Sequence, residues 1–210
     1  RSDAVTDLPI TANGILVDKN VSVNAGSYRM HGGPLIRAEG YTGILLTVKA
    51  GGNIAIENTI DGANIDAQNM PLIQIEKEGI LSLEKDGVFK NNMGLEHALC
   101  VVNYGTFNMN GGMITGNKGK YNHSVFNMGT ANLNSGKIIN NECEGSVYSA
   151  VGSKTNLNSL ALTLSGTDAT IFVEGGAPIN LTSSLHYEIT IESAMDEGDI
   201  VAVGSGNYRL

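Results

Sequence analysis

Apolar and polar residues alternate along short runs of the chain, and these runs recur at a nearly constant interval. When the second apolar residue of each run is used as a marker, successive markers lie 27, 26, 24, 24 and 24 residues apart. The markers are Ile56, Leu83, Met109, Leu133, Leu157 and Leu181. Alternation with period two is typical of a β-strand with one buried face. Its recurrence at this interval predicts a solenoid of stacked coils.

The residues around each marker predict which side chains face the core. The position two residues earlier is mostly apolar and should also point inward, as in Ile54, Leu81, Phe107, Ala131, Thr155 and Ile179. The positions directly before and after the marker should point outward, and nearly all of them are polar. Asparagine dominates these outward columns, at Asn108, Asn110, Asn132, Asn134, Asn156, Asn158 and Asn180. The sheet should therefore carry rows of amides along its outer face.

Two further strands complete each repeat. Five residues after the marker, a second short strand should place apolar residues in register at Val88, Ile114, Ile138 and Leu162. It ends in a column formed by Asn64, Asn91, Asn117 and Asn141 and closed by Ser165. Asparagine tolerates the left-handed backbone of a bend, and stacked amides can bond from coil to coil. A third strand should precede the next turn, within residues 45–51, 72–79, 99–105 and 123–129.

These patterns predict an all-β fold, a parallel β-solenoid with about 24 residues and three short strands in each coil. The alternative is an antiparallel β-sandwich or barrel, which has short strands but does not require the same columns to recur. No helical period and no linker interrupts the pattern, so we expect a single domain over residues 1–210. Residues 1–50 should form irregular first coils or a cap, residues 51–185 the regular coils, and residues 186–210 a closing segment.

Two stretches resemble a known type of repeat. They are "GTFNMNGGMITGN", residues 105–117, and "VFNMGTANLNSGKIINN", residues 125–141. Both are similar to the right-handed parallel β-helix repeats of secreted and surface-anchored proteins of gut bacteria, and residues 196–208 resemble the segment that closes such arrays. The resemblance implies a fold of the pectate-lyase-like superfamily, whose members include polysaccharide lyases, glycosidases, phage tailspikes and non-catalytic adhesin stalks. A fold shared by so many activities does not name a function.

Composition narrows the range of partners. The formal net charge is −8 and the basic residues are scattered, which argues against nucleic acid and anionic membrane surfaces. The chain has no apolar run of 18 residues that would span a bilayer. Cys100 and Cys143 should lie nearly two coils apart, so we expect both to be free, with Cys100 in the core. Because the chain begins at Arg1 without a methionine, we interpret it as part of a larger protein with other domains.

Few groups are candidates for catalysis. The resemblance implies that a polysaccharide lyase of this superfamily would need an arginine base. No arginine lies between residues 51 and 182. The best carboxylates share one outward column or the adjacent bend, where a pair could act as acid and base or hold a cation. They are Glu57, Glu84, Asp61 and Asp66. The simpler interpretation is two solvated glutamates near Lys77 and Lys85, and two aspartates that bond their own turns.

His97, His123 and Cys143 fall in the loops of successive coils, which raises the question of a metal site. Their spacing fits no recognised set of ligands. We therefore expect exposed loop histidines, and the sequence predicts no metal and no cofactor.

The outward asparagines remain as the candidate ligand-binding residues, either as a hydrogen-bonding surface for a glycan or as amides that pair only with each other. Aromatic platforms typical of sugar sites are missing from this face, since Tyr104, Tyr121 and Tyr148 fall nearer the bends and loops. The sequence thus predicts a non-catalytic, extracellular β-helix module, secreted or attached to the cell surface. Its role would be adhesion, carbohydrate binding or spacing within a larger bacterial surface protein. The alternative is a polysaccharide lyase or glycoside hydrolase that acts on a surface or dietary glycan.

Overall fold

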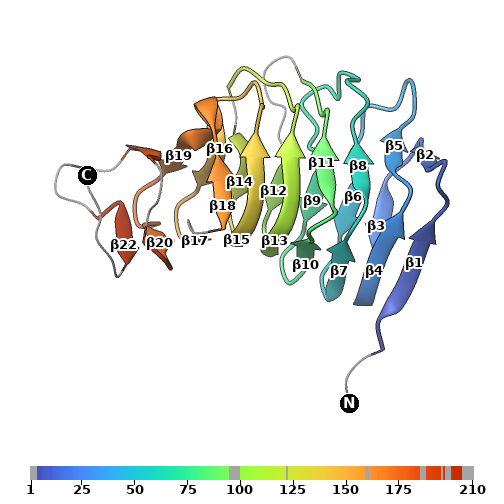
Figure 1. Ribbon diagram of the computed structural model, residues 1–210, viewed down its shortest axis with the longest axis horizontal. Helices are drawn as coiled ribbons and strands as arrows, with labels where there is room; N and C mark the ends of the chain where they lie inside the picture. The colour runs from blue at the N-terminus through green and yellow to red at the C-terminus, as the bar shows by residue number, and fades with distance from the viewer. Residues whose placement is uncertain are drawn as a thin grey trace.

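A computed structural model of the chain describes residues 4–94, 100–121, 123–158, 161–184, 188–194, 196 and 200–204. In these residues the chain is all β, apart from the single 3₁₀ turn η1 (Gly166–Ala169). The strands stack in parallel as an elongated coil, with the N-terminal coil at one end and the C-terminal coil at the other (Figure 1). The predicted parallel β-solenoid is confirmed, and the antiparallel sandwich is excluded.

Three strands per coil form three long faces, which we call the first, second and third sheets. The first sheet contains β1 (Thr6–Ile10), β4 (Gly26–Gly32), β7 (Gly52–Ile56), β10 (Ile80–Leu83), the first halves of β13 (Thr106–Thr115) and β15 (Thr130–Ile139), β17 (Lys154–Leu157), β20 (Ile179–Leu181) and β22 (Ala202–Gly204). The second sheet contains β2 (Ile15–Val17), β5 (Leu35–Arg37), β8 (Thr59–Asp61), β11 (Val88–Lys90), the second halves of β13 and β15, and β18 (Leu162–Leu164).

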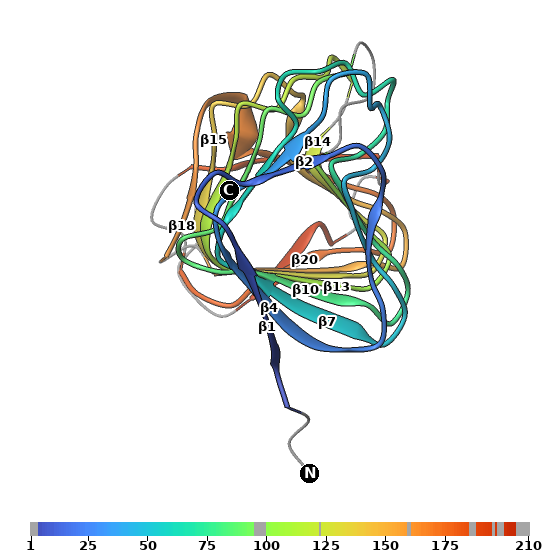
Figure 2. The ribbon, with the colours of Figure 1, turned by 90° about the vertical axis from the view of Figure 1, so that its right-hand side faces the viewer.

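The third sheet has one strand from each of eight coils. These strands are β3 (Val21–Val23), β6 (Leu46–Val48), β9 (Ile73–Ile75), β12 (Val101–Asn103), β14 (His123–Asn127), β16 (Gly145–Ser149), β19 (Thr170–Val173) and β21 (Thr190–Ser193). Seen from its N-terminal end in Figure 2, the chain runs clockwise as it recedes from the viewer, which makes the coil right-handed. This is the hand that parallel crossover connections almost always take.

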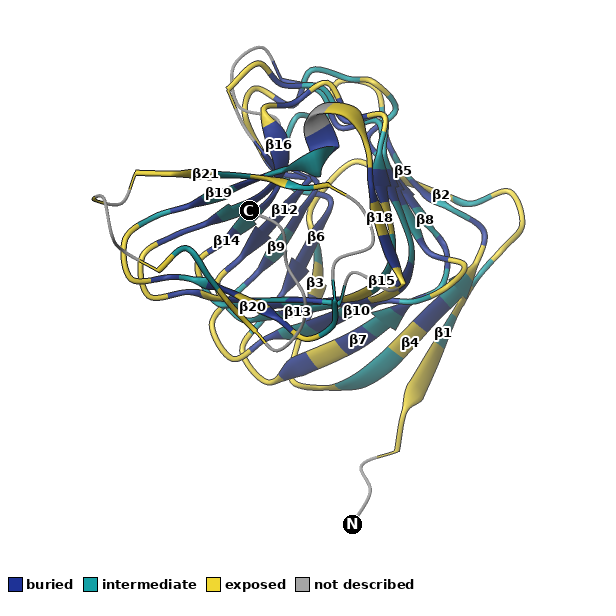
Figure 3. Cartoon of the chain, turned by 60° about the vertical axis from the view of Figure 1, so that its left-hand side comes forward, coloured by how far each residue is buried: buried dark blue, intermediate teal, exposed yellow. Residues whose placement is uncertain are grey.

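The inward columns of the first sheet are as predicted. Leu81 pairs with Phe107, Phe107 with Ala131, Ala131 with Thr155, and Thr155 with Ile179. All of these residues and all six markers are buried, and the markers belong to one continuous hydrophobic core along the coil axis. Figure 3 shows buried residues in dark blue along the strands of successive coils and exposed residues in yellow at many of the bends.

The predicted register of the second sheet is only partly correct. Ile114 does pair with Ile138. However, Phe89 rather than Val88 pairs with Ile114, and Leu164 rather than Leu162 pairs with Ile138. The bend between the first and second sheets differs in length from coil to coil, so a fixed count from the marker fails there. In β11 the larger side chain, Phe89, is the buried one, whereas in β18 both Leu162 and Leu164 are buried.

The predicted irregular first coils are in register with the rest. In the first sheet, Thr6 pairs with Tyr28, and Tyr28 pairs with Ile54. Residues 6–48 therefore form two coils that lengthen the same three sheets. At the other end, β21 pairs with β19 and β22 pairs with β20, so the described part of the closing segment also continues the stack.

A row of buried polar side chains follows the bend after the second sheet. Arg37 Nη2 donates to Asn92 Oδ1 at 2.9 Å, and the backbone N–H of Asn92 donates to Asn117 Oδ1 at 3.0 Å. Asn117 Nδ2 donates to Asn141 Oδ1 at 2.9 Å, and Asn141 Nδ2 donates to Asp168 Oδ1 at 3.0 Å. We call these five residues the inner row; all are buried. The predicted asparagine ladder exists, but with different end members.

The predicted members Asn64, Asn91 and Ser165 are not part of the inner row. Asn91 lies one residue before Asn92 and has a φ of 58°, a left-handed position that Gly116 and Asn140 occupy in the next two coils. Its side chain donates to Asp61 instead. Asn64 also has a positive φ, and its backbone N–H donates to the Asn91 carbonyl. The residue with the left-handed backbone and the residue of the inner row are adjacent in the chain. A column of asparagines counted from the marker does not distinguish these two positions.

A second buried row lies at the bend after the third sheet, and the sequence patterns did not reveal it. Asn103 Nδ2 donates to Asn127 Oδ1 at 2.8 Å, and Asn127 Nδ2 donates to Thr155 Oγ1 at 3.0 Å. Each of these asparagines also accepts a hydrogen bond from the backbone N–H two residues later, at Gly105 and Gly129. The amides therefore fix both the turn and the stacking of successive turns.

Candidate functional site

The outer face of the first sheet carries a ladder of hydrogen-bonded amides. Asn180 Nδ2 donates to Asn156 Oδ1 at 3.0 Å, and Asn156 donates to Asn132 at 2.6 Å. Asn132 donates to Asn108 at 2.8 Å, and Asn108 donates to Ser82 Oγ at 3.3 Å. The predicted amide column is thus present on β10, β13, β15, β17 and β20, half-buried to exposed. Each amide pairs with the coil before it.

A parallel column lies two residues further along these strands. Asn134 Nδ2 donates to Asn110 Oδ1 at 2.9 Å, and Asn110 Nδ2 donates to Glu84 Oε1 at 3.0 Å. Asn158 and Thr182 continue this column in the next coils. We call the two columns together the amide face. All six asparagines predicted as ligand-binding residues lie on it.

The amides of this face keep part of their hydrogen-bonding capacity. Within the ladder, Asn132 uses one N–H to reach Asn108 and one oxygen lone pair to accept from Asn156. A primary amide has two N–H donors and two acceptor lone pairs. Asn132 therefore has one donor and one acceptor left for a partner outside the sheet, and Asn156 has the same. These groups recur once per coil, at about 4.8 Å.

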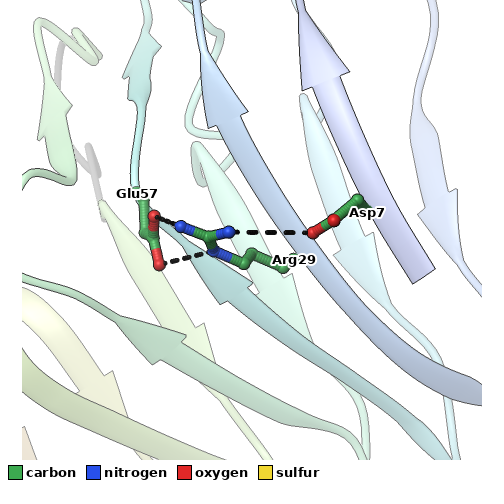
Figure 4. Close-up of polar contacts among 3 residues, drawn as sticks. All are labelled: Asp7, Arg29 and Glu57. Atoms are coloured by element: carbon green, nitrogen blue, oxygen red, sulfur yellow. Dashed lines mark hydrogen bonds and ion pairs between the residues drawn. The ribbon is translucent and has the colours of Figure 1, made fainter. Parts of the chain in front are cut away.

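The N-terminal end of the same face is charged. Arg29 on β4 donates from Nε and Nη2 to the two carboxylate oxygens of Glu57, at 2.8 and 2.6 Å, and its Nη1 lies 3.8 Å from Asp7 on β1 (Figure 4). The hydrogen bond from Arg29 lowers the pKa of Glu57. Figure 4 shows the guanidinium between the two acidic side chains. This is an outward ion-pair row across the first coils.

The four candidate catalytic carboxylates are all engaged in local contacts. Glu57 is paired with Arg29, and Glu84 accepts from Asn110. Asp61 accepts from the backbone N–H of Ala63 at 2.7 Å and lies 3.3 Å from Lys90 Nζ. Asp66 accepts from the backbone N–H of Gln68 at 2.9 Å. The aspartates bond their own turns as the simpler interpretation expected, whereas the partner of Glu57 is Arg29 rather than a lysine.

An open groove borders the amide face where the first sheet bends into the second. It has a volume of about 530 Å³. Its lining is Lys85, Gly87, Val88, Asn110, Gly111, Gly112, Met113, Ser135, Gly136, Lys137, Ala161 and Thr163. A smaller hollow of about 330 Å³ borders the opposite edge of the face, lined by Lys154, Asn156 and Asn180 among others. Both contain lysine, and no carboxylate lines either one.

The sequence patterns missed these grooves. They place Lys85 near the outward glutamates and indicate no role for Lys137. The signal was the pair of small residues after each outward asparagine column, in "NGG" and "NSGK". Such residues mark a close approach of backbone to backbone at a bend.

The outer face of the third sheet carries stacked aromatic rings. Phe126 and Tyr148 are stacked with ring centroids 4.7 Å apart, and Tyr148 and Phe172 with centroids 4.8 Å apart. The Tyr148 hydroxyl donates to Glu174, and burial together with this contact raises the pKa of Tyr148 to about 12. Tyr148 thus lies within a strand, rather than nearer the bends. Because the rings cover each other's faces, the stack offers mainly ring edges to a ligand.

The histidine and cysteine candidates do not form a reactive cluster in the described structure. His123 is buried in β14, so the prediction of an exposed loop histidine is wrong for this residue. Burial lowers its pKa to about 4. Cys100 is a core residue as predicted, and burial raises its pKa; Cys143 is also buried, with a pKa raised to about 11. His97 lies outside the described residues.

Within the described residues, no three or more His, Cys, Asp and Glu side chains are placed to hold a metal ion. No helix in this part of the chain is long and apolar enough to cross a membrane. No protein-family model, curated protein or solved structure matches the chain.

Proposed function

We propose that this chain is a non-catalytic β-solenoid module of a secreted or surface-attached bacterial protein, and that its amide face binds a carbohydrate chain. The observation that carries the proposal is the ladder through Asn108, Asn132 and Asn156, in which each amide keeps one N–H donor and one acceptor lone pair beyond those used within the ladder. An adhesive or spacing role follows from the same architecture, because the stacked coils hold this face on a rigid, elongated body.

A glycan suits this face chemically. Sugar hydroxyl groups donate and accept hydrogen bonds, and an amide that has one of each to spare can satisfy both functions of a hydroxyl. The amides repeat at a fixed interval along the coil axis, so a polymer with repeating units can make the same contact several times. Multiple weak contacts of this kind give useful avidity without a deep pocket.

A binding role is favoured over catalysis by the state of the carboxylates. Glycoside hydrolysis uses two carboxyl groups on opposite sides of the scissile bond. Here Glu57 is held by two hydrogen bonds from Arg29, and Asp61 and Asp66 are turned toward backbone N–H groups. Glu84 accepts a hydrogen bond from Asn110, an amide of the ligand-binding face itself. Extracellular location and additional domains rest on the resemblance of residues 105–141 to surface-protein repeats.

A glycan array tests the proposal directly. We expect the wild-type chain to bind at least one polysaccharide, and the double variant Asn132→Ala with Asn156→Ala to lose most of that binding. Gln74→Ala is the matched control, because Gln74 is an outward, half-buried amide in β9 on the third sheet. Equal binding by both variants would contradict a role for the amide face. If a bound glycan is cleaved, and Glu57→Gln or Glu84→Gln stops the cleavage, the chain is an enzyme instead.

A further inference from the structure

Backbone atoms form the floor of the groove beside the amide face. A Cβ atom at Gly111 would lie 2.7 Å from Lys85 Cα, and one at Gly136 would lie 2.5 Å from the Gly111 carbonyl oxygen. Contacts of this length with backbone atoms leave no room for any side chain. Three successive coils therefore present a floor of bare backbone, and the groove cannot fill without a shift of the coils themselves.

The charge of the groove is opposite to that of the protein. The chain has 21 acidic and 13 basic residues, yet Lys85 and Lys137 line the groove and no carboxylate does. Neither lysine is in any of the ion pairs formed within the described part of the chain. The nearby Glu84 accepts the amide of Asn110 and lies outside the lining. Two cations without acidic partners at the edge of a polar face are suited to an anionic ligand.

The two lysines lie two coils apart along the axis of the solenoid. Lys85 abuts Gly111 of the next coil, and Gly111 abuts Gly136, which precedes Lys137 in the coil after that. Two strand spacings place the lysine backbones roughly 10 Å apart along the axis. An extended glycan in which every second sugar is acidic presents its acidic groups at about this spacing. Asn110 lies in the coil between those of the two lysines and Ser135 in the coil of Lys137, and both offer polar groups for the intervening sugar.

We propose that this groove selects acidic glycans with a disaccharide repeat, in which every second sugar carries a carboxylate or sulfate group. This inference rests on the proposed carbohydrate-binding function and names the class of ligand. Lys85 and Lys137 contact successive acidic groups, and the amide face contacts the hydroxyl groups of the same chain.

The test measures affinity for five immobilised polymers by biolayer interferometry. Unsulfated chondroitin has a carboxylate on every second sugar, sulfated chondroitin adds sulfate, and polygalacturonate has a carboxylate on every sugar. A neutral β-glucan and polyglutamate serve as an uncharged sugar and a polyanion without sugars. The variants are Lys85→Gln with Lys137→Gln and, as a control with the same change in net charge, Lys19→Gln with Lys77→Gln at exposed positions away from the groove.

We expect the unsulfated or sulfated chondroitin to bind more tightly than the other three polymers, and the comparison of these two forms identifies the acidic group. The groove variant should lose roughly tenfold in affinity, the product of two exposed charge contacts, and the control variant should lose little. The inference is overturned if both variants lose affinity equally, if the groove variant binds normally, or if polygalacturonate or polyglutamate binds as tightly. Binding to the neutral glucan alone would remove this inference and keep the proposed function, whereas binding to no polymer here or on the array would remove both.

Discussion

Arg37 and Asp168 stand at opposite ends of one buried row of amides, and every hydrogen bond of the row is donated in the direction from the arginine to the aspartate. Each of these two residues is only 1% exposed. A row of amides that donate in one direction leaves an acceptor unfilled at its start and a donor unfilled at its end. A guanidinium is a strong donor and a carboxylate a strong acceptor, so the two charges complete the row.

The middle of the inner row should be sensitive to substitution. In Asn117→Ala the buried backbone N–H of Asn92 loses its acceptor, and a small cavity replaces the amide. We expect the free energy of unfolding to fall by about 3 kcal/mol, measured by urea denaturation followed by circular dichroism. Asn132→Ala removes an amide with equivalent pairing from the solvated outer ladder, and should cost less than about 1 kcal/mol. Similar losses in the two variants would show that burial of the row contributes little.

The charge at the end of the row gives a second prediction. Asp168 accepts the side-chain and the backbone N–H of Asn141, each at 3.0 Å. Asp168→Asn keeps the shape but turns an N–H₂ group toward one of these donors, so we expect a loss of about 2 kcal/mol in unfolding free energy at neutral pH. Asp86→Asn, at an exposed position, is the control and should change stability little. An Asp168→Asn variant as stable as the wild type would mean that the row does not need an anionic end.

The limits of the sequence patterns lie at the bends. Strict alternation located Leu81, Phe107 and Ala131 correctly, because a strand with one buried face leaves little freedom of register. The bends vary in length, so counting from the marker selected Leu162 where Leu164 pairs with Ile138. It also selected Asn91 for the ladder, although Asn91 supplies the left-handed turn and Asn92 the hydrogen bond.

The sequence patterns predict one part of the candidate site, the amide face, but not the other part, the groove. The amide face follows from period-two alternation and was located residue by residue. The groove depends on backbone approach at Gly111 and Gly136 across three coils. The small residues in "NGG" and "NSGK" indicate such an approach at each bend, but not the groove that successive bends form together. The environment of His123 was misjudged because a residue placed in a loop is the first residue of β14, buried beside Tyr148 and Phe172.

Buried His123 should make the fold sensitive to acid. Its Nε2 atom has no hydrogen-bond partner in the described structure, and burial lowers its pKa from 6.5 to about 4. Between these two values the unfolded chain binds a proton that the folded chain does not, so stability should decrease as the pH falls through this window. The contribution is at most about 3 kcal/mol.

Thermal unfolding of the wild type and His123→Phe between pH 7 and pH 4 isolates this effect. We expect the difference in stability between the two proteins to shift in favour of the variant as the pH falls. Asp168 has a raised pKa and acts in the opposite direction in acid, but it is present in both proteins and cancels in the comparison. His31→Gln, which removes a histidine that is only partly buried, should not reproduce the shift. A constant difference across the range would mean that His123 is protonated equally in both states.

The turns between the third and first sheets should tolerate little added volume. A Cβ atom at Gly129 would lie 2.2 Å from the Gly105 carbonyl oxygen in the preceding coil, while the Gly129 N–H is bonded to Asn127. Gly129→Ala must push two coils apart, and we expect a loss of about 3 kcal/mol or more in unfolding free energy. Gly175→Ala is the matched change in a turn of a later coil, where no atom lies within 4 Å of the added methyl group. It should alter stability by no more than about 0.5 kcal/mol, because the methyl group meets only solvent.

Urea denaturation of the two variants side by side measures the difference. If Gly129→Ala were as stable as Gly175→Ala, the spacing between coils at this turn would be loose, and the close stacking on which the groove and both buried rows depend would not be a rigid property of the fold.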